Sequence, residues 1–387
     1  MPVINRIADY HDEMTEWRQD FHAHPETAFE ETRTAAIIAD KLREFSIDVH
    51  EGLAGTGVIG TLSNGDGPSI GLRADMDALD ILEKTNLPYA STHAGKMHAC
   101  GHDGHVTMLL GAAKYLAETK NFKGTIHFIF QPAEELAGGG RKMVQEGLFD
   151  QFPCDQVFGM HNRPGLPLGE FAICTGPMMA GNAEFEIRIT GKGCHAASPH
   201  LGIDTVVVAA EIICCFQTIT SRNIHPLKSS VVSVTQIHGG DAMNVIPDDV
   251  VLHGTARFFL PEVMEEIESR MRQISEGICS AHGASMTFEF TPGYPCLVNH
   301  EAETEFVKSV AADIVGGDKV DGNLIPTMGV EDFSYLLNER PGAYINIGNG
   351  PSDGDKVLHN PHYNFNDDAL PMGATYWSRL AETALPR

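Results

Sequence analysis

A stretch of nine residues, from Met97 to His105, gathers side chains that are suited to metal chemistry. Its sequence, Met-His-Ala-Cys-Gly-His-Asp-Gly-His, holds one thiol, three imidazoles and one carboxylate. Cys100 and His102 are two residues apart, so on an irregular turn both side chains can face one ion, and thiolate and imidazole are typical zinc ligands. Two ligands do not complete a metal site, so further ligands must come from elsewhere in the chain.

Three more candidate ligands stand at predicted strand ends or in loops of the same domain, namely Glu135, His161 and His359. Glu134 directly precedes Glu135. At an irregular strand end, one carboxylate of such a pair can bind metal while its neighbour stands over the attacking water. The metal then lowers the pKa of that water, and the second carboxylate removes the proton and later returns it to a leaving amine. The pair therefore indicates metal-assisted hydrolysis.

The same residues also have plain structural interpretations. Adjacent glutamates usually form a solvated surface, and a lone histidine such as His161 is usually structural. Cys100 with a nearby histidine could also form a nucleophilic cysteine pair. Spacing by itself leaves the choice between these interpretations open.

The composition excludes several classes of partner. The chain has 387 residues, of which 42% are hydrophobic and 20% charged, as in an ordered globular protein large enough for two domains. A net charge of −25 argues against binding to nucleic acid or to an anionic membrane. We also see no signal peptide and no run of about 18 apolar residues. Eight cysteines without paired spacing favour reduced thiols. We therefore expect a cytoplasmic protein without membrane or nucleic-acid partners.

Strands and helices alternate over the first part of the chain. The predicted strands cover residues 56–62, 69–72, 125–130 and 156–160, and the predicted helices 4–22, 32–45, 106–117 and 138–147. Short, nearly continuous apolar runs are typical of strands buried in a sheet that helices cover on both faces. Polar groups at the ends of these strands place the site at the carboxyl edge of the sheet. We therefore predict an α/β domain with a mixed sheet flanked by helices.

The pattern changes near residues 176–181. From there the order is strand, helix, two strands, helix, strand, which is the split arrangement of a ferredoxin-like module. The last part of the chain returns to alternating helices and strands. We therefore predict a catalytic domain of residues 1–180 and 293–387 that is interrupted by an inserted α+β domain of residues 181–292.

Short motifs along the whole chain occur together in a fixed order. They are His98-Ala-Cys-Gly-His-Asp-Gly-His105, Gln131-Pro-Ala-Glu-Glu135, Gly159-Met-His161, Gly193-Cys-His-Ala-Ala197 with Pro199-His200, Asn244-Val-Ile-Pro247, Gly254-Thr-Ala-Arg257 and Leu358-His-Asn-Pro361. With these motifs the chain resembles the cysteine-containing branch of the dinuclear metal amidohydrolases, which includes hippurate hydrolase, N-acyl-amino-acid aminoacylases and auxin-conjugate hydrolases. The resemblance implies a metallopeptidase-like catalytic domain, and an inserted domain that forms a lid and mediates dimerisation.

The resemblance also implies a role for each site residue. Two divalent ions (Zn, Mn, Co or Ni) would be bound by Cys100, His102, Glu135, His161 and His359. Glu134 would be the general base and later the acid. His195 would stabilise the oxyanion in the site of a partner subunit, which requires a homodimer or a higher oligomer. Asn244 and Arg257 match substrate-binding positions, and a guanidinium suits a carboxylate because it offers two parallel hydrogen bonds.

Other residues are expected to support the site or to depart from the family pattern. Asp75 matches a carboxylate that orients a ligand, and Asp103 could do the same. Asp80 replaces a common proline, and Cys194 stands where a small residue is usual. Neither departure removes a catalytic group.

The expected function is hydrolysis of the amide bond of N-acyl amino acids, of the hippurate or N-acetyl type. A dipeptidase or an N-acetyl-diaminopimelate-type deacetylase is the alternative within the same chemistry, because residues that would select the substrate are scattered over both domains. Two alternatives belong to other classes. One is a non-catalytic protein that binds metal or conjugates, and the other is a thiol hydrolase that uses Cys100.

Overall fold

A computed structural model describes residues 3–352, 354 and 356–387 and shows two compact units. The larger unit comprises Met1–Met178, Val298–Ile325 and Asp332–Arg387, and the smaller unit comprises Met179–Leu297 and Pro326–Glu331. The smaller unit thus extends beyond the predicted insertion of residues 181–292 at both ends. Its second segment was not predicted, because it joins the unit through contacts between residues far apart in the sequence, such as the hydrogen bond from the N–H of Ala180 to the carbonyl of Thr327 (3.0 Å).

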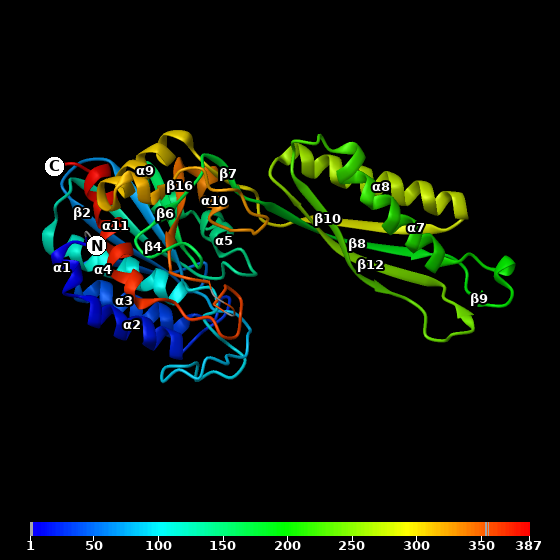
Figure 1. Cartoon of the computed structure of the whole chain (residues 1–387), viewed down its shortest axis with the longest axis horizontal. Helices are drawn as coiled ribbons and strands as arrows, with labels where there is room; N and C mark the ends of the chain where they lie inside the picture. Colours follow the sequence, from blue (N-terminus) through cyan, green and yellow to red (C-terminus); the bar gives the residue numbers. More distant parts are fainter. Residues whose placement is uncertain (1–2, 353, 355) are drawn as a thin grey trace. The chain divides into compact units, whose positions relative to one another are not determined.

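The larger unit is built on an eight-stranded mixed sheet with the strand order β1-β2-β4-β3-β5-β16-β6-β15 (Figure 1). Its strands are β1 (Asp48–Leu53), β2 (Gly57–Asn64), β3 (Ser69–Asp75), β4 (Gly124–Gln131), β5 (Gln156–Arg163), β6 (Phe171–Ala172), β15 (Val320–Asp321) and β16 (Gly342–Gly348). The neighbours β4, β3, β5 and β16 run parallel. Because parallel strands end at the same edge, the residues that follow them can meet in one site.

Helices flank this sheet, which confirms the predicted α/β architecture (Figure 1). They are α1 (Asn5–Ala8), α2 (His11–Ala23), α3 (Thr32–Glu44), α4 (His102–Thr119), α5 (Gly139–Gln145), α6 (Leu148–Gln151), α9 (Glu301–Val315), α10 (Ser334–Glu339) and α11 (Leu370–Ala384). Helix α4 is buried along most of its length. Leu109 of α4, Phe128 of β4 and Trp377 of α11 belong to one core and are at most 1% exposed. Helix α4 is therefore a rigid support for residues at its start.

Three details differ from the sequence predictions. The predicted helix over 4–22 is interrupted between α1 and α2, and strand β1, whose sequence is largely polar, was not predicted. Helix α4 begins at His102 and not at Val106, as the apolar pattern indicated. The reason is that residues 102–105 are polar but buried, so the periodicity of apolar residues does not reveal them.

The smaller unit has the strand and helix order expected of a ferredoxin-like module. Its main elements are β8 (Gly181–Thr190), α7 (Thr205–Thr218), β10 (Ser230–His238), β12 (Asp249–Phe258), α8 (Pro261–His282) and β13 (Ser285–Pro292). The sheet is antiparallel in the order β10-β12-β8-β13. Ile187, Ile212 and Ile267 join the sheet and the two helices in one buried core.

Shorter strands complete the structure. A two-stranded ribbon in the smaller unit pairs β9 (Cys194–His195) with β11 (Val245–Ile246). The strands β7 (Gly176–Met179) and β14 (Leu297–Asn299) lie where the chain passes from one unit to the other.

Candidate metal centre

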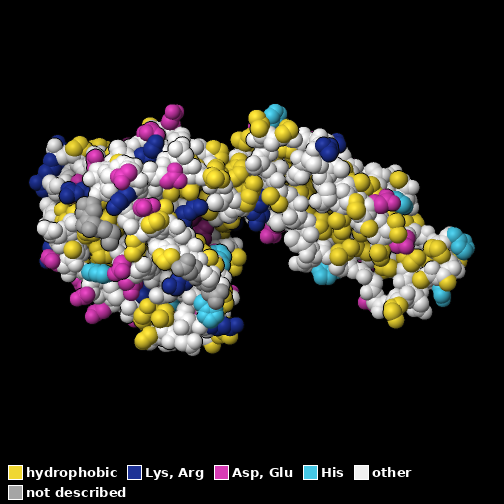
Figure 2. Space-filling model, in the orientation of Figure 1, with side chains coloured by type: hydrophobic (Ala, Val, Ile, Leu, Met, Phe, Trp, Pro, Cys, Tyr) yellow, Lys and Arg dark blue, Asp and Glu magenta, His cyan; other side chains and the backbone are white. Residues whose placement is uncertain are grey.

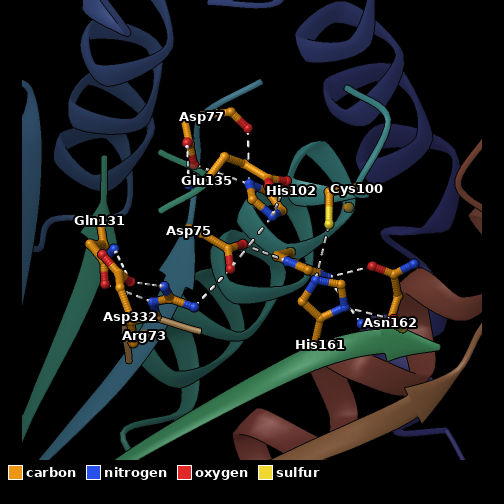
Figure 3. A network of polar contacts seen from close by, with 12 residues as sticks. Arg73, Asp75, Asp77, Cys100, His102, Gln131, Glu135, His161, Asn162 and Asp332 are labelled. Carbon is orange, nitrogen blue, oxygen red and sulfur yellow. Dashed lines mark hydrogen bonds and ion pairs between the residues drawn. The ribbon is translucent and has the colours of Figure 1, made fainter. Parts of the chain in front are cut away.

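The five predicted ligands come from four segments of the larger unit, one of which carries both Cys100 and His102, and they meet at the carboxyl edge of its sheet. The ligand atoms of Cys100, His102 and His161 lie within 4.8 Å of one another, and so do those of Cys100, Glu135 and His359. Figure 3 shows Cys100, His102 and His161 pointing toward one another. Because Cys100 belongs to both groups, its sulfur lies between two possible cation positions.

The backbone around these ligands adopts conformations that few residues tolerate. Gly101 separates Cys100 from His102 at φ +93°, and a Cβ at this position would lie 2.5 Å from Oδ1 of Asn162. Only glycine fits such a position without displacing the neighbouring side chain. His359 has φ +62°, which is unfavourable for a residue with a side chain. Strained backbone of this kind is often retained at functional sites.

Direct contacts already link the ligands in pairs. The sulfur of Cys100 lies 3.3 Å from Nε2 of His161, and Nε2 of His359 lies 3.3 Å from Oε1 of Glu135. The side chain of His102 is fully buried, whereas that of His359 is 53% exposed. The site is therefore closed on the side of α4 and accessible on the side of the loop that carries His359.

Charge accumulates in this buried site. Burial lowers the pKa of His102, but Asp75, Asp77 and Glu135 outweigh this effect and raise it to about 10. Burial raises the pKa of the Cys100 thiol well above its ordinary value, and the neighbouring carboxylates raise it further. Several buried carboxylates so close together are unfavourable unless a cation compensates their charge.

The residues fit a divalent metal. Nε2 of His102 is buried and has no hydrogen-bond partner among the described residues, and Oε1 of Glu135, 3.8 Å from it, is also buried and contacts the ring of His359 (3.3 Å). Buried polar atoms without partners are rare, and a cation between them would supply the missing interaction. Sulfur, imidazole and carboxylate ligands together suit borderline metal ions.

An aspartate that the sequence interpretation missed orients two of the ligands. Nδ1 of His102 donates to the Asp77 carbonyl (2.9 Å) and lies 3.1 Å from its Oδ1, and the N–H of Glu135 donates to Oδ2 of Asp77 (3.0 Å). Protonation of Nδ1 leaves the Nε2 lone pair for a metal. The sequence feature that could have revealed Asp77 is Asp-Met-Asp at the end of β3. Alternate residues point to the same side of an extended strand, so this spacing places Asp77 on the side of Asp75.

Asp75, which was predicted to orient a ligand, makes its hydrogen bonds to residues around the ligands, and its Oδ2 lies 3.8 Å from Nε2 of the ligand His102. It accepts hydrogen bonds from Nδ1 of His105 (2.5 Å) and from Arg73 (2.7 Å). Nε2 of His105 bonds to Oδ1 of Asn162 (2.7 Å), the residue directly after His161. His105 therefore belongs to the polar support of the site, together with Asn162, which the sequence interpretation did not single out.

Asp103 is also placed differently from the prediction. Its carboxylate accepts a hydrogen bond from Nδ1 of His22 (2.8 Å) and lies 3.6 Å from Arg18. It also accepts the N–H of Gly104 in the first turn of α4 (3.0 Å). These contacts attach α2 to the start of α4, so Asp103 anchors the helix that carries His102.

Glu134 lies beside the ligands and not on a solvated surface. Glu134 is 7% exposed, and the side chain of Glu135 is 9% exposed. Oxygen atoms of both residues lie within 4.8 Å of a ring nitrogen of His102. This is the position expected of a carboxylate that acts on a reacting group next to bound metal.

The remaining predicted residues lie in the smaller unit, at two distant places. His195 and Asn244 line one cavity of about 780 Å³ beside the ribbon of β9 and β11, and the N–H of Ala196 donates to the Asn244 carbonyl (3.0 Å). Asp249, at the start of β12, lines the same cavity. Arg257 is eight residues further along β12, which corresponds to roughly 26 Å along a strand. The structure thus brings His195 and Asn244 together but leaves Arg257 at the other end of the sheet.

Comparisons with known proteins agree with this site. The model of peptidase family M20/M25/M40 matches residues 71–383. Hippurate hydrolase of Campylobacter jejuni is 39% identical over 98% of this chain and 99% of that protein, and N-acetyl-L-cysteine deacetylase of Bacillus subtilis is 41% identical over 93% and 85%. A solved structure from Bacillus subtilis, a dinuclear metal-binding peptidase of family M20, superposes with a TM-score of 0.86 at 35% identity and covers 98% of this chain and 99% of that one. This chain belongs to peptidase family M20/M25/M40.

Proposed function

We propose that this protein hydrolyses the amide bond of N-acyl amino acids with two divalent metal ions, releasing a carboxylate and a free amino acid. The observation that carries the proposal is the meeting of Cys100, His102, Glu135, His161 and His359 in two groups that share Cys100, with the buried Glu134 beside them. Hippurate and N-acetyl-L-cysteine, after which two of the relatives are named, are both N-acyl amino acids.

Glu134 is the residue that moves protons in this proposal. Its carboxylate takes the proton of the attacking water and later gives it to the nitrogen of the leaving amino acid. When bound, the metal ions polarise the amide carbonyl and lower the pKa of the attacking water. His102 and Glu135 keep their positions because Asp77 bonds to both of them.

His195 and Arg257 would act on different groups of the substrate, which agrees with their separate places in the smaller unit. Arg257 would bind the substrate carboxylate, Asn244 would contact the substrate, and His195 would donate a hydrogen bond to the oxyanion. His195 shares a cavity with the start of β12, whereas Arg257 lies near the other end of that strand, so a small substrate cannot touch both in one copy of the chain. We therefore propose that His195 acts in the site of a second copy.

Two exposed surfaces of the smaller unit support a homodimer or a higher oligomer. Strand β10 is an edge strand, so its free backbone groups can pair with another chain. Helix α7 buries Ile212 in the core but exposes Val206 and Val207, each 46% exposed. Figure 2 shows hydrophobic side chains gathered on one face of the smaller unit. Residues Thr205–Asn223 form a helical stretch that is long and apolar enough to cross a membrane. Since one of its faces packs in the core, we attribute this composition to packing and to contact between subunits.

The metal and the compartment are part of the proposal. The donor set suits Zn, Mn, Co or Ni, and supply in the cell as well as affinity decides which ion is bound. All eight cysteines are free, which supports a reducing compartment such as the cytoplasm.

The test is a panel of N-acyl amino acids, dipeptides and N-acetyl-diaminopimelate, assayed with each of the four metals. We expect release of free amino acid from hippurate or N-acetyl-amino acids, and loss of this activity after chelation. Preference for dipeptides or for N-acetyl-diaminopimelate would favour the alternative substrates, and no turnover with any metal would favour a binding protein. Activity that survives complete removal of metal but is abolished by alkylation would support a thiol hydrolase instead. The high pKa of the buried Cys100 thiol argues against that outcome.

A further inference from the structure

Glu31 is a buried carboxylate that the proposed chemistry does not use. It stands directly before α3 and is 0% exposed. Burial is the main reason why its pKa is raised, to about 7. A carboxylate is costly to bury unless hydrogen bonds compensate the lost hydration, so its partners indicate what it does.

The side chain of Glu31 serves a distant loop and not its own helix. At the start of α3, the free N–H groups of Arg33 and Thr34 donate to the carboxylate of Glu26 (3.0 and 2.8 Å). Glu31 makes no capping hydrogen bond to the helix. Its carboxylate therefore remains available for contacts elsewhere.

Both oxygens of Glu31 are engaged. Oε1 accepts the backbone N–H of Ala133 at 2.9 Å, and Oε2 accepts the hydroxyl of Thr56 at 2.7 Å. Ala133 is 102 residues away in the sequence and has φ +56°, a left-handed conformation that is unfavourable for alanine. Glu31 thus accepts a hydrogen bond from the strained residue itself.

Ala133 immediately precedes Glu134 and Glu135. Its carbonyl accepts the N–H of Gly139 (3.0 Å), and a Cβ on Gly139 would lie 1.7 Å from the Pro132 carbonyl oxygen, so this loop is tightly folded. Asp77 holds the N–H of Glu135, and Glu31 holds the N–H of Ala133. Glu134 lies between these two fixed points.

We infer that Glu31 is a positioning residue that holds Ala133 in its left-handed conformation and thereby directs the side chains of Glu134 and Glu135 toward the metal centre. The inference rests on the proposed function for its effect on turnover. Its effect on metal binding does not depend on which substrate is cleaved.

The main test is Glu31→Ala. We expect kcat to fall about 10- to 100-fold with KM within twofold, and the Zn²⁺ dissociation constant, measured by competition with a chelator, to rise about tenfold, as is typical when a partner that orients a ligand is removed. Leu42→Ala is the stability-matched control, because Leu42 is a fully buried residue of the same helix whose loss leaves this hydrogen bond in place. It should lower Tm while kcat and Zn²⁺ binding stay within twofold.

Three further variants separate positioning from a general loss of stability. Glu31→Gln keeps an oxygen for Ala133 and offers an N–H to Thr56, so it should remain within threefold of the parent. Glu31→Asp cannot reach both partners and should resemble Glu31→Ala, and it serves if Glu31→Ala fails to fold. Ala133→Gly accepts the left-handed conformation without strain, so adding it to Glu31→Ala or Glu31→Asp should restore at least a part of kcat and of Zn²⁺ affinity.

Two results would overturn the inference. One is Glu31→Ala or Glu31→Asp with kcat and Zn²⁺ affinity equal to those of Leu42→Ala, and the other is failure of Ala133→Gly to restore either quantity. If no substrate is turned over by the parent protein, the proposed function fails, but the Zn²⁺ competition still decides whether Glu31 positions the loop.

Discussion

The metal centre of the larger unit and the pair His195 and Asn244 of the smaller unit differ in how they are held. His102 is fully buried and fixed by Asp77, which is in turn joined to the loop of Glu135. His195 and Asn244 are exposed; His195 belongs to a ribbon of only two short strands, and Asn244 directly precedes the second of them. The metal ligands are therefore preorganised within the larger unit, whereas His195 and Asn244 remain accessible to a binding partner or substrate.

This difference indicates how the two groups contribute to catalysis. Metal ligands must be held accurately, because an ion accepts only certain distances and directions. A hydrogen-bond donor that completes a site from another surface must first remain accessible. We therefore expect changes in the larger unit to affect metal binding or proton transfer, and changes at His195 to affect turnover alone.

The largest effect should come from Glu134→Gln. The variant keeps the shape of the side chain but cannot accept the proton, so we expect kcat to fall about a thousandfold. Metal content per chain, measured after gel filtration, should stay at the parent value. Near-normal turnover would show that Glu134 is not the base, and loss of metal would place it among the ligands.

His195→Ala should reduce kcat about a hundredfold, because removal of one oxyanion donor typically has an effect of this size. A mixture of this variant with Glu134→Gln tests whether His195 acts on a second copy. After reassociation of a dimer, random pairing would restore about a quarter of the parent activity, since half of the dimers would have one complete site. If His195 acts within its own chain, the mixture stays as inactive as the separate variants.

The smallest effect concerns stability and pH in the larger unit. His127 of β4 is 5% exposed, and burial lowers its pKa to about 4. The unfolded chain takes up this proton near pH 6.5, so the stabilisation is complete above that pH and is lost as the pH falls toward 4, by up to about 3 kcal/mol. His127→Gln should therefore flatten the fall in the free energy of unfolding between pH 6.5 and 4, as measured by urea denaturation. A fall in the free energy of unfolding that is as steep in this variant as in the parent would contradict the assignment.

The residue types and their order along the chain were sufficient to predict the fold class and the kind of chemistry. Apolar runs of strand length and alternating helices indicated the α/β sheet, because burial on both faces requires continuous apolar strands. The Cys-Gly-His and Glu-Glu sequences were compatible with metal and carboxylate chemistry, and the ordered set of motifs along the chain favoured that interpretation over the structural ones. The smaller module was recognisable from its order of strands and helices.

Only the tertiary structure decided which polar residues support the site. The partner of His102 is Asp77 and that of His105 is Asp75, and nothing in the spacing distinguishes these two aspartates as acceptors. Glu31 reaches Ala133 across 102 residues, and such long-range hydrogen bonds leave no periodic pattern in a sequence. A sequence determines which side chains are available and how each segment folds locally, but the pairing of distant polar groups depends on how the segments pack.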